Sequence, residues 1–447
     1  ENELSNSSST TYIPILKSRQ IIVTHDLFLP TMVTFVDSRL EVAVRTAIGA
    51  KTKPLDLQIL SKLEEFDLSE VELVDPNGIE GKIRNLRGLE FCRNIRFLNL
   101  NGKLSPPEGK IHFDISPLKG LSRLEYVDLS QNRIQDLRPL KNLSNLSTLI
   151  LEQNHITDLE ALVDLNQLRH LNLNQNVIHD PLPGKESILS KITSLELLLL
   201  SKNPISDLDV LSNLVNLREL DVSYCQLSDI DPLRNLTNLV VLNFSYNQVR
   251  DLHAMSSLNN LEYLDGAANQ IDNLEAIETI EKLITISFAN NHIRNIYPLV
   301  SRLDLLETPS GQIDLRQNPL NNTGITSHIP NLKKSKIQVE FDSPKLEPVT
   351  LADDNLENAI RKELKIPSRI LTAEDLLELN ELKLDTSDTE ITSIVGLDQA
   401  ANLQILEIQG WKNNPFSDLS PLSELENLTQ LILWGQQITD LNPLEKL

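Results

Sequence analysis

A leucine-rich unit of 22 residues repeats along most of this chain with the pattern L-x-x-L-x-x-L-x-L-x-x-N-x-I-x-D-L-x-P-L-x-x. The regular copies begin near Leu121, Leu143, Leu165, Ile192, Leu214, Leu236, Leu258 and Ile280. A unit this short cannot bury its own apolar face, so it is stable only when it is stacked on further copies. The repeat therefore predicts an elongated solenoid.

Each repeat predicts a short strand followed by a turn. The two leucines of L-x-L, such as Leu171 and Leu173, point inward, and the residues between and beside them point outward. The D-L-x-P-L stretch that follows suits a tight helical turn, because proline is favoured near a helix start. We therefore expect an α/β solenoid of horseshoe form, with a concave parallel β-sheet and short helical turns on the convex side.

Two polar columns accompany the leucines. An asparagine follows the second leucine of L-x-L by three positions, where its buried amide can satisfy backbone groups of adjacent turns. An aspartate recurs just before the convex segment, where its carboxylate can accept from the first N–H groups of a helical turn. The columns are Asn132, Asn154, Asn176, Asn203, Asn247, Asn269, Asn291 and Asn318, and Asp136, Asp158, Asp180, Asp207, Asp229, Asp251, Asp418 and Asp440.

A predicted helical cap precedes the repeats, and its sequence occurs twice. Residues 33–36 predict a strand, and Asp37 then begins an amphipathic helical pattern that would cover the first repeat. A near-duplicate starts at Val349, with Asp353 in the place of Asp37. The chain is therefore expected to hold two tandem capped arrays.

The predicted domains are an N-terminal extension (1–30), a helical cap (31–94), a first array with its closing segment (95–345), a second helical cap (346–402) and the start of a second array (403–447). Residues 337–341 alternate like a final edge strand, which would close the first array. The second array reaches Leu447 without such a segment, although terminal repeats need a polar cap. We therefore expect the natural protein to continue past Leu447.

Cap, repeat and closing segment together resemble bacterial internalin-type leucine-rich repeat proteins. The motifs that carry the resemblance are D-[LI]-x-P-L in the repeats, D-x-x-L-E-x-A-[VI]-R in both caps, and N-P-L, H-I-P-x-L and V-x-F in the closing segment. The resemblance covers residues 31–447 and implies a leucine-rich repeat horseshoe, secreted or attached to the bacterial surface, that binds other proteins through its concave face. The chain departs from the pattern in starting a second array and in showing no wall anchor or immunoglobulin-like domain.

The charge balance restricts the partners. The chain has 41 Lys and Arg against 63 Asp and Glu, a net charge of −22. Nucleic acids are bound by Lys and Arg concentrated on one face, so we expect no nucleic-acid partner. The longest apolar run, around residues 195–200, is far shorter than the ~20 residues that cross a bilayer. We expect no membrane span, and the polar residues 1–9 do not form a signal peptide.

No catalytic or metal-binding motif occurs in the sequence. G-x-S-x-G, G-x-x-x-x-G-K-[ST], G-x-G-x-x-G, H-E-x-x-H and C-x-x-C are all missing, so we expect no enzyme, no catalytic residue and no cofactor. The histidines His155, His170, His179, His253 and His292 are scattered over several repeat positions, and one aspartate per turn falls short of the oxygens that calcium requires, which predicts no metal site. Cys92 and Cys225 lie several repeats apart and predict two buried thiols, not a disulfide.

The outward strand positions are the expected binding surface, because large apolar or aromatic side chains there have no role in folding. Tyrosine also favours strands in general, but it is enriched among interface hot spots. The predicted partner-binding stripe on the concave face consists of Phe97, Tyr126, Ile150, His170, Leu197, Leu199, Tyr224, Tyr246 and Tyr263. A secondary candidate in the second array consists of Trp411, Ile432 and Trp434.

These observations favour a non-enzymatic protein–protein interaction module, namely a bacterial surface or secreted protein of adhesion or host interaction. Its expected ligand is a host or cell-surface protein, and its expected location is extracellular or on the bacterial surface. Two alternatives remain open. The solenoid would be a spacer for a catalytic or anchoring domain beyond Leu447, or an intracellular regulatory subunit, since the repeat length also resembles the leucine-rich repeat regulator of protein phosphatase-1.

Overall fold

The computed structural model describes residues 32–179, 188–305, 311–321, 324–342, 348–366, 369–385, 390–409, 415–434 and 437–445. The chain divides into two compact units, one of Glu1–Asn318 with Leu332–Glu340 and one of Pro319–Asn331 with Phe341–Leu447. Three predictions from the sequence lie outside the described residues: the extension over residues 1–30, the capping role of Asp180 and the surface role of Trp411.

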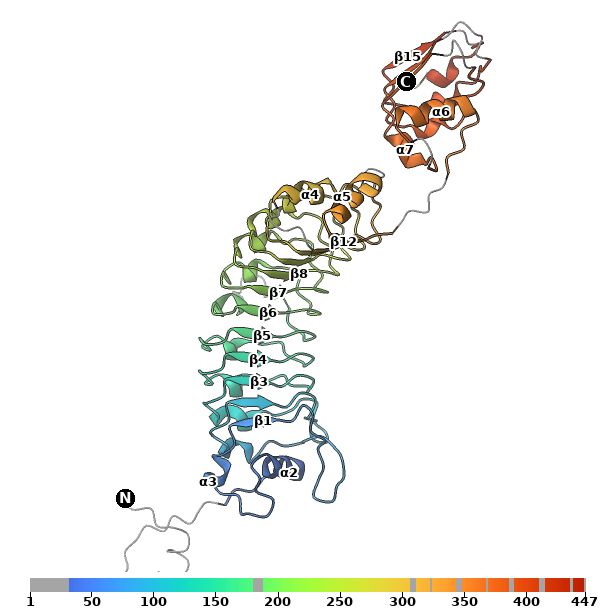
Figure 1. The fold of residues 1–447 in the computed structure, drawn as a ribbon. Helices are drawn as coiled ribbons and strands as arrows, with labels where there is room; N and C mark the ends of the chain where they lie inside the picture. The colour runs from blue at the N-terminus through green and yellow to red at the C-terminus, as the bar shows by residue number, and fades with distance from the viewer. Residues whose placement is uncertain are drawn as a thin grey trace, which may run out of the picture. The chain divides into compact units, whose positions relative to one another are not determined.

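Within the described part of the first unit, twelve short parallel strands form one sheet in sequence order (Figure 1). The strands are β1 (Glu65–Asp67), β2 (Phe97–Asn99), β3 (Tyr126–Asp128), β4 (Thr148–Ile150), β5 (His170–Asn172), β6 (Leu197–Leu199), β7 (Glu219–Asp221), β8 (Val241–Asn243), β9 (Tyr263–Asp265), β10 (Thr285–Ser287), β11 (Gly311–Asp314) and β12 (Ile337–Glu340). The predicted parallel sheet is therefore confirmed, and the predicted edge strand over residues 337–341 is β12, which pairs with β11.

Short helical turns follow the strands on the other side of each repeat. In this unit they are η2 (Leu89–Phe91), η3 (Ser116–Gly120), η4 (Arg138–Leu140), η5 (Glu160–Leu162), η6 (Leu189–Lys191), η7 (Asp209–Leu211), η8 (Asp231–Asn235), η9 (His253–Ser257), η10 (Glu275–Ile277), α4 (Tyr297–Ser301) and η11 (Arg302–Leu305). A π-helical turn, η12 (Gly324–His328), and α5 (Ile329–Lys334) come between β11 and β12 in the chain. Most of these turns are 3-10 helices, because a 22-residue unit leaves no room for several α-helical turns.

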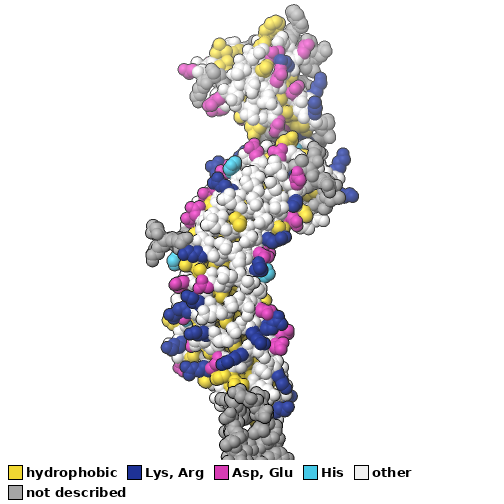
Figure 2. Space-filling view, turned by 90° about the vertical axis from the view of Figure 1, so that its left-hand side faces the viewer, with side chains coloured by type: hydrophobic (Ala, Val, Ile, Leu, Met, Phe, Trp, Pro, Cys, Tyr) yellow, Lys and Arg dark blue, Asp and Glu magenta, His cyan; other side chains and the backbone are white. Residues whose placement is uncertain are grey.

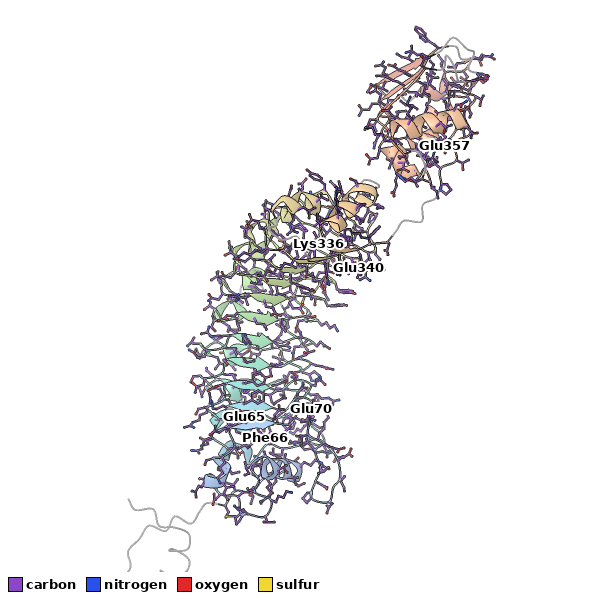
Figure 3. The ribbon with its side chains drawn as sticks, in the orientation of Figure 1. Glu65, Phe66, Glu70, Lys336, Glu340 and Glu357 are labelled. Atoms are coloured by element: carbon purple, nitrogen blue, oxygen red, sulfur yellow. The ribbon has the colours of Figure 1, made fainter. Side chains whose placement is uncertain are left out.

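The leucine pattern determines which side chains form the core. Leu171, Leu173, Leu220 and Val222 are fully buried, as predicted for both positions of L-x-L. The sheet extends beyond the regular repeats at both ends, where Figure 3 labels Glu65 and Phe66 on β1, and Lys336 and Glu340 around β12. Phe66 is 1% exposed and enters the core, whereas Glu65 beside it is exposed, so the alternation already holds in the first strand.

The asparagine column forms the predicted hydrogen-bonded ladder. Asn154 is typical: its amide nitrogen donates to the carbonyls of Leu129 and Leu151, both at 3.0 Å. Its oxygen accepts from the amides of Asn132 and Ile134 at 3.2 and 2.8 Å. One buried side chain thus satisfies four backbone groups across two consecutive repeats.

One repeat replaces the ladder asparagine with cysteine. Cys225 is fully buried and forms no disulfide, and its thiol donates to the Leu200 carbonyl at 3.3 Å. Cys92 is also buried and forms no disulfide, and burial, followed by the charge of Glu90, raises the pKa of its thiol to about 12. Both cysteines are therefore inert core residues, as predicted.

The structure contains a second asparagine column that the sequence analysis missed. It lies near the loop that leads into each strand, and each side-chain amide donates to a backbone carbonyl of the preceding repeat. The clearest bonds join Asn145 to Ser122, Asn216 to Thr193, Asn238 to Val215 and Asn260 to Thr237, at 2.8 to 3.0 Å. Each repeat is therefore tied to its neighbour at two separate points.

The aspartate column caps the helical turns, as predicted. The carboxylate of Asp136 accepts from the amide of Arg138, the first residue of η4, at 2.9 Å. The same bond to the amide two residues later is made by Asp158, Asp207, Asp229, Asp251, Asp418 and Asp440. Seven of the acidic residues of the chain therefore have a local structural use.

The N-terminal cap contains α2 (Ser38–Ala47) and α3 (Leu57–Leu60). Asp37 accepts from the amides of Arg39 and Leu40 at the start of α2, and also from the amide of Arg84 at 2.6 Å. The strand predicted for residues 33–36 was wrong. Val33 and Phe35 are buried in extended backbone, but only single hydrogen bonds, from Val33 to Leu55 and from Val36 to Arg87, hold this segment, so no ladder forms.

The second unit repeats this plan with its own core. It contains α6 (Asp354–Glu363), α7 (Ala373–Leu377), a three-stranded parallel sheet of β13 (Glu381–Asp385), β14 (Ile405–Gln409) and β15 (Gln430–Leu433), and the turns η13 (Leu397–Gln399), η14 (Ser420–Leu422) and η15 (Asn442–Leu444). Asp353 caps α6 through Asn355 and Leu356, and it also accepts from the amide and hydroxyl of Thr392. The two predicted caps therefore share one structural feature, a buried aspartate whose carboxylate joins a helix to a distant loop.

The ladder predicts the effect of a single deletion. We expect Asn154→Ala to lower the free energy of unfolding of the first unit by about 3 kcal/mol, because it leaves buried backbone groups without partners. Urea unfolding followed by circular dichroism measures this change. Gln153→Ala, on the exposed neighbouring residue, is the control and is expected to change stability by less than about 0.5 kcal/mol. Equal effects of the two variants would contradict the role of the ladder.

The second cap predicts a pH dependence. Burial raises the pKa of Asp353, but hydrogen bonds from Thr392, Leu356 and Asn355 outweigh it and leave that pKa below its ordinary value of 3.8. Because folding lowers this pKa, the stabilisation is complete above the unfolded-state pKa and is lost as the pH falls through the folded-state value.

We expect Asp353→Ala to lower the free energy of unfolding of the second unit by about 2 kcal/mol at neutral pH, and the difference from wild type to shrink below about pH 4. Both tryptophans of the chain belong to this unit, so tryptophan fluorescence in urea reports on it selectively. Asp354→Ala, which leaves the cap in place, is the control. A difference that stays constant down to pH 3 would contradict the prediction.

Candidate functional site

The face of the twelve-stranded sheet opposite the core is the concave face, and its side chains form straight rows across the strands. The first row consists of Phe97, Tyr126, Thr148, His170, Leu197, Glu219, Val241 and Tyr263, which pair in register one after another. The second row, two residues later, consists of Asn99, Asp128, Ile150, Asn172, Leu199, Asp221, Asn243 and Asp265. Parallel pairing spaces the members of a row by ~4.8 Å.

The predicted stripe does not form one continuous surface. Phe97, Tyr126, His170, Leu197 and Tyr263 lie in the first row, and Ile150 and Leu199 lie in the second. Tyr224 and Tyr246 lie in neither, because they follow the strands at the edge of the sheet. Polar residues such as Thr148 and Glu219 interrupt the first row, so the candidate residues form separate groups.

One group is the aromatic pair at the N-terminal end. The rings of Phe97 and Tyr126 stack with centroids 4.3 Å apart and planes 7° from parallel. Partial burial, followed by the negative charges of Asp128 and Asp67, raises the pKa of Tyr126. Both rings are only partly exposed, so this pair offers a limited apolar surface.

The second group is more exposed and lies at the strand exits. The rings of Tyr224 and Tyr246 stack with centroids 4.1 Å apart, and the side chains are 45% and 53% exposed. The Lys202 ammonium lies 5.4 Å from the centre of the Tyr224 ring, within the range of a cation–π contact. The pKa of Tyr224 is raised, first by desolvation and then by the Tyr246 hydroxyl.

Lys202 was not predicted, although the repeat could have identified it. It occupies in its own repeat the place that Tyr224 and Tyr246 occupy in theirs, so alignment of the repeats puts the three residues in one column. A prediction from residue type alone does not single out a lysine that stands between a glutamine and two tyrosines in this column.

The third group combines Tyr263 with acidic side chains. Partial burial, followed by the charges of Asp265 and Asp221, raises the pKa of Tyr263. Burial also raises the pKa of Asp265, and the like charges of Asp221 and Asp314 raise it further, against hydrogen bonds from Ala267 and Ser287. This part of the concave face therefore carries negative charge that would be stabilised by a cation.

The second row shows which side chains the scaffold itself requires. Asn99, Asp128, Asp221, Asn243 and Asp265 each accept from the amide two residues later, at 2.9 to 3.1 Å. Ile150 and Leu199 occupy the same position and cannot accept such a bond. Folding does not explain these two apolar side chains on the concave face, which supports their place among the candidates.

A pair of neighbouring substitutions tests this distinction. We expect Ile150→Asn to change the free energy of unfolding by less than about 1 kcal/mol, because the new side chain can make the bond of its row. We expect Leu149→Asn to lower it by more than about 3 kcal/mol, because Leu149 is fully buried and the amide would lack partners. Thermal unfolding measures both, and a similar loss in the two variants would show that Ile150 belongs to the core.

The secondary candidate lies in the second unit. Trp434 is 62% exposed directly after β15, and Ile432 is partly exposed within that strand. Trp411 lies outside the described residues. Ile432 therefore lies on the last described strand, and Trp434 follows that strand directly.

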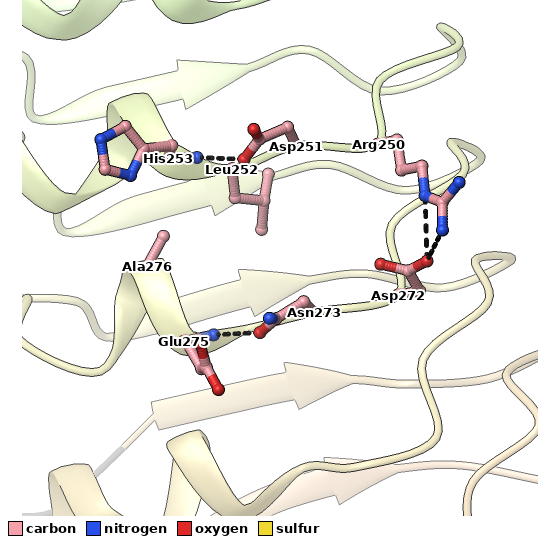
Figure 4. A pocket seen from close by; sticks show the side chains of 8 residues that line it. All are labelled: Arg250, Asp251, Leu252, His253, Asp272, Asn273, Glu275 and Ala276. Carbon is pink, nitrogen blue, oxygen red and sulfur yellow. Dashed lines mark hydrogen bonds and ion pairs between the residues drawn. The ribbon is translucent and has the colours of Figure 1, made fainter.

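A cavity of about 560 Å³ lies between two neighbouring repeats on the side of the helical turns (Figure 4). It is lined by Arg250, Asp251, Leu252, His253, Asp272, Asn273, Glu275 and Ala276. Four of its polar side chains already have partners: Arg250 pairs with Asp272 at 2.6 Å, and Asp251 and Asn273 accept from backbone amides at 2.8 Å. The cavity is a furrow between repeats, and its polar groups hold the scaffold.

No group of three or more His, Cys, Asp or Glu side chains among the described residues is arranged to hold a metal ion. Two histidines lie close together, His112 and His155, whose Nδ1 atoms are 3.4 Å apart. No described helix is both long and apolar enough to cross a bilayer. On the face drawn in Figure 2, dark-blue Lys and Arg side chains alternate with magenta Asp and Glu, and the yellow hydrophobic side chains form small separate spots.

Comparison with known proteins identifies the repeats. The leucine-rich repeat model matches residues 122–178, and the model for two copies of leucine-rich repeats matches residues 193–235. No curated protein matches the sequence of this chain.

Three solved structures are similar to this chain. The functional domain of InlJ from Listeria monocytogenes, which includes a cysteine ladder, has a TM-score of 0.52 at 18% identity, over 92% of this chain and 77% of its own. A leucine-rich repeat protein from Leptospira interrogans has a TM-score of 0.51 at 20% identity, over 88% and 90%. An internalin, inlF, from Listeria monocytogenes has a TM-score of 0.49 at 24% identity, over 92% and 93%.

The twelve-stranded sheet, its asparagine ladder and the matched repeats together show that the chain has a leucine-rich repeat fold. Its fold is that of bacterial internalin-like leucine-rich repeat proteins, which the sequence motifs had indicated.

Proposed function

We propose that this chain is a non-enzymatic module that binds a protein partner on the concave face of its first unit, and that it acts on the surface of a bacterium or after secretion. The partner would be a host or cell-surface protein. The proposed architecture comprises two capped arrays with the domain limits predicted from the sequence. The leucine-rich repeat fold supports the interaction role, since it presents rows of variable side chains on a rigid sheet.

The exposed stack of Tyr224 and Tyr246 is the observation that carries this proposal. Two large aromatic side chains remain about half exposed, although burial would stabilise them in the fold. Each ring restricts the other, so binding costs little further side-chain entropy. Aromatic anchors of this kind supply much of the energy of protein interfaces. Ile150 and Leu199 add apolar surface where the scaffold would use a polar residue.

The length of the concave face suits a folded partner. Twelve strands at a spacing of ~4.8 Å make a surface of roughly 50 Å, comparable to the width of a small protein domain. The residues along it vary from aromatic to acidic, so that different partner groups can be recognised at different repeats. This variation supports a macromolecular ligand.

A triple variant tests the proposal. We expect replacement of Tyr224, Tyr246 and Tyr263 with Ser to abolish partner binding and to lower the free energy of unfolding by no more than about 2 kcal/mol, the scale of one aromatic pair. Surface proteins of intact animal cells are passed over the immobilised wild-type chain and over the immobilised variant, and the proteins that each retains in stoichiometric amount are compared. Thermal unfolding of each chain shows whether it is folded. The matched control replaces Ile79, Ile111 and Val215 with Ser, since these exposed side chains lie outside the strands. Retention of the same protein by all three chains would contradict the proposal.

A further inference from the structure

The residues that follow the third outward position of each strand form a column at the edge of the concave face, here called the exit column. Its members are Gln131, Gln153, Gln175, Lys202, Tyr224, Tyr246, Ala268, Asn290 and Gln317, and all have a positive φ between 54° and 60°. The amides of Tyr224, Tyr246 and Ala268 each donate to a carbonyl of the next repeat at 2.8 to 3.0 Å. The exit column therefore keeps the ~4.8 Å spacing of the sheet.

The order of residues in the exit column leaves one aromatic face uncovered. Lys202 lies over one side of Tyr224, and Tyr246 stacks on Tyr224 from the next repeat. The residue after Tyr246 is Ala268, whose side chain is a single methyl group, and Asn290 lies one repeat further on. Tyr246 and Asn290 are thus about 10 Å apart along the column, which leaves room for one planar group between them.

The repeat that contains Ala268 is unusual in having the run Gly266, Ala267 and Ala268 after β9. Gly266 has a packing reason, since a Cβ there would lie 2.5 Å from the ring of Phe244 and 2.8 Å from that of Phe288. Ala268 has no such constraint, because its equivalents in the other repeats, such as Tyr246 and Asn290, all carry larger side chains. Its small side chain lowers the surface beside Tyr246 and forms a notch.

A carboxylate lies at this notch. Asp265 accepts from the amide of Ala267, the residue before Ala268, at 3.0 Å. Burial and the charges of Asp221 and Asp314 raise the pKa of Asp265, so a positive charge placed here would be stabilised. The notch therefore combines the half-exposed ring of Tyr246, the space left by the small side chain of Ala268 and a carboxylate that lies near other negative charges.

We propose that the partner inserts an arginine side chain into this notch, with its guanidinium stacked on Tyr246 and its charge directed toward Asp265. The inference rests on the proposed function and adds the chemistry of the group that is recognised. A guanidinium is planar, weakly hydrated and always charged, so it satisfies the aromatic face and the carboxylate together. A neutral aromatic ring would leave Asp265 without a counter-charge, and a lysine ammonium is not planar.

The experiment uses the full chain and a fluorescent peptide, Gly-Ser-Arg-Gly-Arg-Ser-Gly, with matched peptides in which lysine, citrulline or tryptophan replaces arginine. Fluorescence anisotropy at low ionic strength measures their dissociation constants. We expect the arginine peptide to bind about tenfold more tightly than each of the others, the scale of one desolvated cation–π contact. Citrulline keeps the shape of the side chain and removes the charge.

Three variants locate the site. Ala268→Tyr fills the notch with a side chain that the same backbone conformation already carries at Tyr224 and Tyr246, so the fold is expected to tolerate it. Asp265→Asn removes the charge. Both are expected to weaken binding of the arginine peptide about tenfold, whereas Gln153→Ala, at the distant end of the exit column, is expected to leave it unchanged. Thermal unfolding verifies that each variant is folded.

Equal binding of the arginine and lysine peptides, tighter binding of the tryptophan peptide, or an arginine affinity unaffected by Ala268→Tyr would overturn the inference. None of these results affects the proposed function, which fails only if the triple tyrosine variant retains the protein partner. If that variant loses the partner while the peptides do not discriminate, the concave face binds by other chemistry.

Discussion

The side-chain amide that joins consecutive turns is the interaction on which the rest of this structure depends. A 22-residue turn must bury backbone groups where the chain leaves the sheet, and those groups need partners in every repeat. Asn154 supplies four of them, and asparagines at the same place bond to neighbouring turns in the other regular repeats except that of Cys225. By linking each turn to the next, the ladder sets the register of the strands. The rows of outward side chains are a consequence of that register, and so is the stacking of Tyr224 on Tyr246.

The sequence was a good guide wherever one repeat could be compared with the next. The inward position of Leu171, the ladder role of Asn132 and the capping role of Asp136 all follow from a residue type that recurs at a fixed place. The helix caps at Asp37 and Asp353 were predictable for a similar reason, since the same short sequence appears twice. Single-copy features were predicted less well. Residues 33–36 alternate like a strand, but a strand also needs a neighbour with which to pair, and the sequence does not show one.

The candidate site was only partly predictable, because its groups depend on neighbours across repeats. Tyr224, Tyr246 and Tyr263 were selected as similar outward tyrosines, yet the first two form a stack at the edge of the sheet and the third lies among carboxylates. Lys202 and Asp265 were not predicted because a charged residue on a solvated face does not by itself indicate a binding role. Their significance comes from the ring or amide beside them, which is a property of the stacked structure.

The left-handed backbone of the exit column has a consequence for how such a protein can change. This conformation costs any residue other than glycine about 1 kcal/mol of folding free energy, and the cost is similar for glutamine, lysine, tyrosine and alanine. Exchange among these residues therefore leaves the stability of the scaffold almost unaltered while the surface changes completely. Each repeat contributes one such freely variable side chain, at a spacing close to the thickness of a stacked ring. The side chains along this edge can therefore be substituted one repeat at a time, by evolution or by design, without changes to the packing of the core.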